Sequence, residues 1–182
     1  GLNTGGNSLT LSNSSTSLIS QTATVKFIND ATNNLITNCT ILGSSTVTTT
    51  TNGGTVFFST ATSGGTGNDN NTISNSNIGP SSAGLPIKAI YANGSTTSTT
   101  INNSNIAITG CNIYDYFNAS SANRGILIND GNTDWTISNN KFYQTTPRTW
   151  TSGTTHYVIS INNDQGNNFQ ITNNTIGFAS SA

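Results

Sequence analysis

Acidic side chains, the usual source of acid–base chemistry, are few in this chain of 182 residues. All six are aspartates: Asp30, Asp69, Asp115, Asp130, Asp134 and Asp164. Glycoside hydrolysis typically needs two carboxyl groups about 5–9.5 Å apart. Asp130 and Asp164 close two similar segments, GILIND and YVISINND, so they are the one acid pair that the sequence predicts to lie close together. The pair could bind Ca²⁺ or act in catalysis, but we favour a role in which each aspartate supports a turn at the end of a strand.

Aromatic residues gather in two short segments, YDYF (Tyr114 to Phe117) and KFYQTTPRTW (Lys141 to Trp150). Each segment begins in or near the end of a seven-residue repeat, ITGCNIY for the first and ISNNKFY for the second, and these two copies are consecutive. We therefore expect both segments to leave the fold at the same place on neighbouring turns. We predict one ligand-binding patch, which comprises Tyr114, Asp115, Tyr116, Tyr143, Arg148 and Trp150. Flat rings beside a few charged groups suit sugar rings, which offer apolar faces and hydroxyl edges. The alternative is that the rings form a satellite core beneath a longer loop.

The usual catalytic and metal-binding motifs are absent from the sequence. No GxSxG, HExxH, P-loop or dinucleotide fingerprint occurs, and neither does the spacing of an EF-hand loop. His156 is the single histidine, and a surface or turn position is favoured over a role as general base. Cys39 and Cys111 occupy the same heptad position about two turns, and hence roughly 10 Å, apart, which exceeds the reach of a disulfide. We therefore predict two small buried thiols.

Composition narrows the choice of partners. Only 6% of the residues are charged, the net charge is −1 and 32% of the residues are hydrophobic, which argues against a disordered coil. Without a basic run there is no electrostatic footprint for nucleic acid, and no segment approaches the roughly 18 apolar residues of a membrane span. We therefore expect neither nucleic-acid binding nor membrane insertion. The excess of small polar residues favours a secreted or cell-surface bacterial protein.

The repeated heptad predicts the architecture. It occurs as ITNCTIL, ISNSNIG, ITGCNIY, ISNNKFY and ITNNTIG, and the starts, at residues 36, 73, 108, 137 and 171, are separated by 37, 35, 29 and 34 residues. Such a period is typical of a solenoid. A second strand-like element, seen in VKFIND and IKAIYANG, alternates with the heptad, and no window reads as an amphipathic helix. Equivalent strands stack most simply in parallel about 4.8 Å apart. We therefore predict an all-β fold, a right-handed single-stranded parallel β-helix of about five to six turns.

Each position of the heptad has an expected role. Two interior columns are predicted, one of Ile36, Ile73, Ile108, Ile137 and Ile171, and one of Ile41, Ile78, Ile113, Phe142 and Ile176. Between them one position holds Asn38, Asn75, Asn139 and Asn173, with Gly110 as the exception. Asparagine tolerates the left-handed conformation of a sharp bend, and stacked amides can bond to one another, so these four residues are predicted to form a structural Asn ladder.

At this point the heptads, together with the IND and NND strand ends, resemble a family. They look like the right-handed parallel β-helix repeat proteins, which include the pectate-lyase-like superfamily and large secreted or surface-attached proteins of bacteria. The resemblance covers roughly residues 24–178 and is specific for the fold. Polysaccharide lyases, glycoside hydrolases, epimerases, phage tailspikes and adhesins are all built on this fold, so the resemblance does not choose an activity.

We treat residues 1–182 as a single β-helix segment, with residues 1–23 as a degenerate N-terminal turn or cap. Because no capping segment is evident, the chain is expected to be an excerpt of a longer solenoid, or to stack on adjacent turns or like chains.

The expected function is that of a non-catalytic secreted or cell-surface scaffold or adhesin-like module. Its expected partner is a polysaccharide or cell-surface glycan bound by the aromatic loops. No cofactor is expected, and Ca²⁺ at Asp130 and Asp164 is the less favoured alternative. One alternative is a polysaccharide lyase or glycoside hydrolase that uses these two aspartates with Arg124 or Lys141. Another is a receptor-binding solenoid similar to a phage tailspike.

Overall fold

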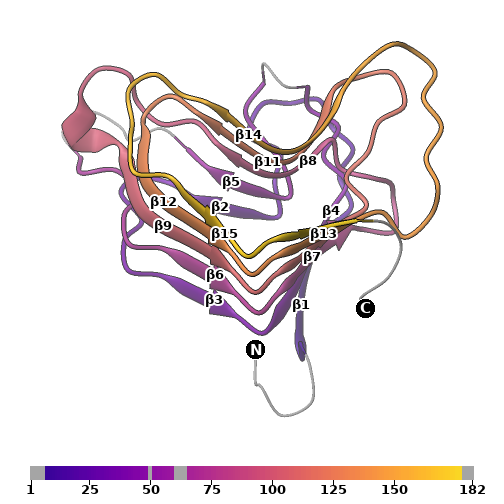
Figure 1. Cartoon of the computed structure of the whole chain (residues 1–182), viewed down its shortest axis with the longest axis horizontal. Coiled ribbons are helices and arrows are strands. Elements are labelled where there is room, and N and C mark those ends of the chain that lie inside the picture. Colours follow the sequence, from indigo (N-terminus) through magenta and orange to yellow (C-terminus); the bar gives the residue numbers. More distant parts are fainter. Residues whose placement is uncertain (1–6, 49–50, 60–64, 178–182) are drawn as a thin grey trace.

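The computed structural model describes residues 7–48, 51–59 and 65–177, and these residues form a parallel β-solenoid of about five turns (Figure 1). The strands belong to three sheets, and every pairing between named strands is parallel. In Figure 1, two of the sheets form the two arms of a V, and the third sheet lies above them. The predicted all-β parallel β-helix is therefore confirmed.

Each full turn contributes one strand to each sheet, in the order sheet 1, sheet 2, sheet 3. Sheet 1 contains β2 (Val25–Phe27), β5 (Val56–Phe58), β8 (Lys88–Ala92), β11 (Asn123–Asn129) and β14 (His156–Asn162). Sheet 2 contains β3 (Leu35–Thr37), β6 (Thr72–Ser74), β9 (Asn103–Thr109), β12 (Asn132–Ser138) and β15 (Gln170–Thr172). Sheet 3 contains β1 (Leu9–Asn13), β4 (Cys39–Gly43), β7 (Asn77–Pro80), β10 (Asn112–Tyr114), β13 (Lys141–Tyr143) and β16 (Thr175–Ile176). A 3-10 helix, Thr99–Ile101, precedes β9.

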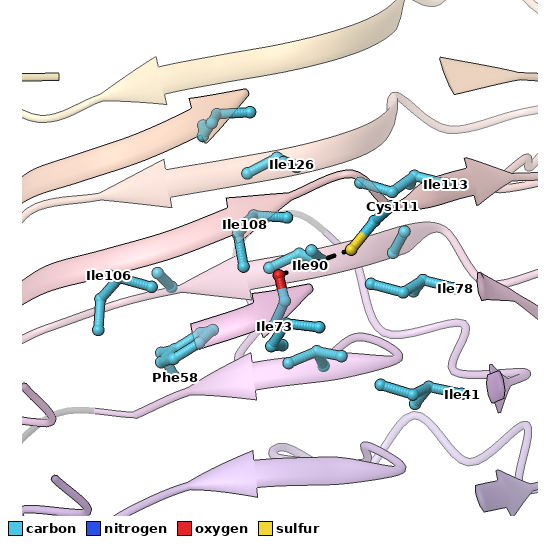
Figure 2. Packing of buried hydrophobic residues seen from close by; sticks show 14 of the residues in the cluster. Ile41, Phe58, Ile73, Ile78, Ile90, Ile106, Ile108, Cys111, Ile113 and Ile126 are labelled. Atoms are coloured by element: carbon cyan, nitrogen blue, oxygen red, sulfur yellow. Dashed lines mark hydrogen bonds between the residues drawn. The ribbon is translucent and has the colours of Figure 1, made fainter. Parts of the chain in front are cut away.

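The two predicted apolar columns are confirmed by the strand register. Ile36, Ile73, Ile108, Ile137 and Ile171 pair in sequence across sheet 2. Ile41, Ile78, Ile113, Phe142 and Ile176 do so across sheet 3, and Leu11 of β1 extends that column by one turn. Figure 2 shows Ile41, Ile78 and Ile113 stacked one above another. Each fully buried isoleucine contributes about 1.5–3 kcal/mol, so the buried members of both columns stabilise the coil.

The bend between sheets 2 and 3 has the left-handed conformation that the sequence predicts. The backbone angle φ is 53° at Asn38, 46° at Asn75, 64° at Gly110, 56° at Asn139 and 55° at Asn173. The ladder expected at these asparagines needs correction, because the side chains of Asn75, Asn139 and Asn173 are exposed. The bend directs its own side chain outward and turns the next residue into the coil. In the described part of the chain, the amide-to-amide hydrogen bonds therefore join other asparagines.

One buried ladder lies at the corner between sheets 1 and 2. The Nδ2 of Asn68 donates to the Oδ1 of Asn103 at 2.8 Å, and the Nδ2 of Asn103 donates to the Oδ1 of Asn132 at 3.0 Å. All three side chains are completely buried. Each amide satisfies its neighbour on the next turn, so the polar corner can be closed to water without leaving unpaired groups.

A second set of stacked side chains follows the left-handed bend directly. The backbone N–H of Cys39 donates to Ser76 Oγ at 3.1 Å, that of Cys111 to Asn140 Oδ1 at 2.9 Å and that of Asn140 to Asn174 Oδ1 at 3.0 Å. Cys39 and Cys111 are buried and do not pair with each other, which confirms the prediction of buried thiols. The Cys111 Sγ contacts the carbonyl oxygen of Ile73 at 3.6 Å (Figure 2), and burial raises the pKa of its thiol to about 11.

Within the N-terminal range, residues 7–23 contribute the strand β1 to the coil. β1 pairs in parallel with β4 as the outermost strand of sheet 3. Residues 1–6 of the expected N-terminal turn or cap lie outside the described residues.

Candidate functional site

The two aromatic loops leave the solenoid from neighbouring strands at the same place. Residues 115–122 connect β10 to β11, and residues 144–155 connect β13 to β14. Tyr114 and Tyr143 are register partners at the ends of β10 and β13. The longer connection, orange in Figure 1, projects from the coil on the right of the view. The strand register therefore shows that the two loops start from one corner of the coil.

Tyr114 and Tyr143 form a stacked pair on the outward side of sheet 3. Their ring centres are 5.5 Å apart and their planes differ by 10°. The ring of Tyr114 also lies over Gly79 of the preceding turn, where a Cβ atom would come within 2.4 Å of it. One face of each ring is thus covered by the other ring, and Gly79 covers the second face of Tyr114. Burial raises the pKa of both hydroxyls, which therefore stay protonated at neutral pH.

Asp115 and Arg148 tie the two loops together. Arg148 Nη2 is 2.6 Å from Asp115 Oδ1, and Asp115 also accepts hydrogen bonds from the backbone N–H and the hydroxyl of Thr145 at 2.7 and 2.5 Å. Arg148 Nε donates to Gln144, whose Nε2 donates to the carbonyl oxygen of Tyr116. The Asp115 carboxylate is buried and has three donors. Its role here is to hold the loops, because its oxygen atoms are already occupied.

Tyr116 differs from the expectation of an exposed ring. It belongs to the hydrophobic core, and a Cβ atom at Gly125 would come within 2.9 Å of its ring. Its ring stacks on that of His156 with centres 4.8 Å apart and planes 7° apart. His156, expected at a surface or turn position, is the half-buried first residue of β14, and burial lowers its pKa. Burial raises the pKa of the Tyr116 hydroxyl strongly.

A pocket of about 210 Å³ lies between the longer loop and the last turns of the coil. Four of the six predicted patch residues line it: Tyr116, Tyr143, Arg148 and Trp150. Tyr114 and Asp115 support this lining, because Tyr114 stacks on Tyr143 and Asp115 pairs with Arg148. The sequence therefore located four of the eleven described residues that line the pocket.

The sequence missed several members of the same pocket. Phe117, Gln144 and His156 line it together with the core residue Phe142, the partly buried Val158 and the exposed Ile176. Trp150 packs edge-on against Phe117 with ring centres 4.9 Å apart and lies 6.3 Å from His156. Phe117 and Gln144 belong to the two quoted segments and could have been included on that basis. His156 lies outside both segments, and no sequence pattern marks it as a pocket residue. Its position beside the pocket depends on the length of the 144–155 loop that precedes it.

The acid pair predicted by the repeat does lie close together. Asp130 Oδ1 accepts a hydrogen bond of 3.0 Å from the backbone N–H of Asp164. In the same way, Asp30 Oδ1 accepts a hydrogen bond of 3.0 Å from the backbone N–H of Gly67, which lies on the next turn. Both contacts join successive turns, which fits the structural role favoured for these strand-end aspartates.

The residues named for a hydrolase or lyase are spread around the coil. Arg124 lies near the start of β11 and Asp130 directly follows its end, about 20 Å away at roughly 3.3 Å per residue, and Lys141 lies on sheet 3. Within residues 7–48, 51–59 and 65–177, no group of three or more His, Cys, Asp or Glu side chains could hold a metal ion.

No helix in this part of the chain is long and apolar enough to cross a membrane.

Comparisons of the chain with family models, with curated proteins and with solved structures find no match.

Proposed function

We propose that this solenoid is a non-catalytic recognition module of a secreted or cell-surface protein, and that its aromatic pocket binds a glycan. The observation that carries the proposal is the pocket itself, in which aromatic rings lie beside the polar groups of Arg148, Gln144 and His156. Rings and polar groups arranged in this way complement the apolar faces and the hydroxyl edges of a sugar.

The form of the pocket suits binding better than hydrolysis. The acid nearest to it, Asp115, is held by Arg148 and Thr145, and its two oxygen atoms accept three hydrogen bonds. Glycoside hydrolysis uses a pair of carboxyl groups on either side of the scissile bond. Asp130 and Asp164 do not line the pocket. The described residues that line the pocket include no acid, and binding without cleavage is the function that these groups favour.

The backbone supports a recognition role in a second way. The 115–122 loop joins two strands that each pair with a neighbour on both sides, and the 144–155 loop joins β13 to the outermost strand β14. The Asp115–Arg148 ion pair links one loop to the other. A site on such a preorganised support loses little conformational entropy when a ligand binds. A tailspike-like arrangement would use the same pocket, and it differs in requiring a trimer in solution.

The test is a glycan-array and polysaccharide pull-down with the Tyr143→Ala variant beside the parent chain. We expect glycan binding that falls at least about tenfold in the variant, because the ring supplies a wall of the pocket, and no cleavage products in the supernatant. Tyr143→Phe is the matched control and should retain most of the binding, since it keeps the ring and loses only the hydroxyl. Release of reducing ends or unsaturated sugars would overturn the proposal in favour of an enzyme. Binding that is equal in both chains would place the glycan elsewhere.

A further inference from the structure

The aromatic pocket beside the 144–155 loop offers few hydrogen-bond acceptors to a ligand. Its described lining residues include no aspartate or glutamate. The side-chain carbonyl among them, that of Gln144, already accepts a hydrogen bond of 3.0 Å from Arg148 Nε. Burial lowers the pKa of His156, so its ring is neutral at neutral pH and has one donor and one acceptor nitrogen. The hydroxyl groups of an unsubstituted sugar are donors as well as acceptors, and as donors they find few partners here.

The same pocket has unengaged hydrogen-bond donors. Among the described residues, none accepts a hydrogen bond from the indole N–H of Trp150 or from the ring of His156. Arg148 uses Nε and Nη2 in its bonds to Gln144 and Asp115, which leaves the N–H groups of Nη1. A donor that is shielded from water and left without an acceptor is costly. A ligand that supplies acceptors and adds few donors therefore suits this lining.

The inner side of the pocket is apolar, and the space is small. Phe142 belongs to the hydrophobic core and Val158 packs against that core, while Phe117 and Trp150 meet edge-on with ring centres 4.9 Å apart. The volume of about 210 Å³ lies below the roughly 300–1,000 Å³ that is typical of pockets for drug-sized ligands. One substituted sugar unit suits such a space better than a longer stretch of a glycan chain does.

We propose that this pocket binds an acetylated sugar unit, whose acetyl carbonyl oxygen accepts hydrogen bonds from the N–H groups of Trp150 and His156. The acetyl methyl group packs against Phe142 and Val158. An acetyl ester has no donor and an acetamido group has one N–H, and both add a carbonyl acceptor and a methyl group that the apolar side can bury. This assignment rests on the proposed function, since it names the class of sugar that the aromatic pocket takes.

Calorimetry with the full chain compares two pairs of neutral oligosaccharides. The first pair is a trimer of N-acetylglucosamine and the glucose trimer with the same linkage. The second pair is an O-acetylated mannan oligomer before and after alkaline removal of its acetyl groups. We expect the acetylated member of at least one pair to bind at least about tenfold more tightly than its partner, because the partner leaves the N–H donors unmatched. A preference in the first pair identifies an acetamido group as the ligand, and a preference in the second identifies an acetyl ester.

A double variant, Trp150→Phe with His156→Phe, removes the two proposed donors and keeps a ring at each position. In this variant the ratio of the affinities for the acetylated and the acetyl-free oligomer should fall to about threefold or less. Tyr157→Phe is the matched control, because it removes a hydroxyl group from an exposed ring of β14 that does not line the pocket. It should keep the ratio of the parent chain. The melting temperature of each variant checks that the fold is kept.

Equal affinity for the two members of both pairs, or the same ratio in the double variant as in the parent chain, would overturn the inference. If Tyr143→Ala still weakened binding in that case, the pocket would remain the glycan site and only the acetyl group would be excluded. Absence of binding by all four oligomers would also overturn the inference, and the glycan array then decides whether the proposed function holds.

Discussion

At the scale of single residues, Lys88 is a positive charge enclosed by the protein. Its side chain is completely buried, its ammonium group lies 4.2 Å from the centre of the Tyr91 ring, and burial lowers its pKa from 10.5 to about 7. Between these two pH values the unfolded chain binds more protons than the folded chain does, so the free energy of unfolding rises with pH. We expect this rise between pH 7 and 8.5, with a slope of up to ~1.4 kcal/mol per pH unit.

Urea denaturation at pH 7 and pH 8.5 measures this slope. Lys88→Met should remove the rise, because the titrating group is gone, while Lys26→Met, a change at an exposed lysine, should keep it. Burial raises the pKa of the Cys111 thiol from 9.0 to about 11, so this group acts in the opposite direction and lowers stability mainly between pH 9 and 11, above the chosen range. A stability that is flat in the parent chain, or that rises equally in Lys88→Met, would contradict the assignment.

At the scale of elements, the ladder of Asn68, Asn103 and Asn132 holds the corner between sheets 1 and 2 across three turns. Asn103 Oδ1 accepts hydrogen bonds from the backbone N–H and the amide of Asn68, and its Nδ2 donates to Asn132. Asn103→Ala leaves two buried groups without partners, the backbone N–H of Asn68 and the Oδ1 of Asn132, at about 1–3 kcal/mol each, while the Nδ2 of Asn68 loses one of its two acceptors and keeps the carbonyl oxygen of Ser59. We expect the free energy of unfolding to fall by about 3 kcal/mol or more, as measured by urea denaturation.

Asn139 provides the comparison, because it belongs to the ladder that the heptad alone suggested. Its side chain is exposed and its φ is 56°, so Asn139→Gly keeps a residue suited to that conformation. The variant should change stability by less than about 1 kcal/mol. If Asn139→Gly cost as much as Asn103→Ala, the bend asparagines would be the ones that hold the coil together.

At the scale of the whole molecule, the two sides of the solenoid present apolar strand edges. β14, β15 and β16 are outermost on one side and β2, β3 and β1 on the other. Ile176 is 64% exposed on one side and Leu35 65% on the other. Open parallel edges with exposed members of the core columns favour pairing with another solenoid. We therefore expect the chain to associate with itself as its concentration rises.

Sedimentation velocity over a hundredfold range of concentration tests this expectation. Ile176→Lys should weaken the association, because it places a charge at the open end of an apolar column. Thr136→Lys, on the side of the coil rather than at its end, should leave it unchanged. A fixed trimer at all concentrations would instead support the tailspike-like arrangement, and a monomer throughout would exclude association through the strand edges.

The sequence alone determined the fold, the two apolar columns, the left-handed bend and the shared origin of the aromatic loops. All of these follow from periodicity, since in a parallel solenoid residues at one repeat position must stack. Hence Ile113 meets Phe142, and Tyr114 meets Tyr143.

Only the tertiary structure decided the features that do not repeat. The paths of individual loops bring Asp115 to Arg148, turn Tyr116 into the core against Gly125, and place His156 on its ring. The orientation of side chains at each corner decided which asparagines form the buried ladders. The burial of Lys88 likewise depends on contacts with Thr48 and Thr51, about 40 positions earlier in the sequence. A local sequence pattern does not show such contacts, because they depend on how one turn covers another.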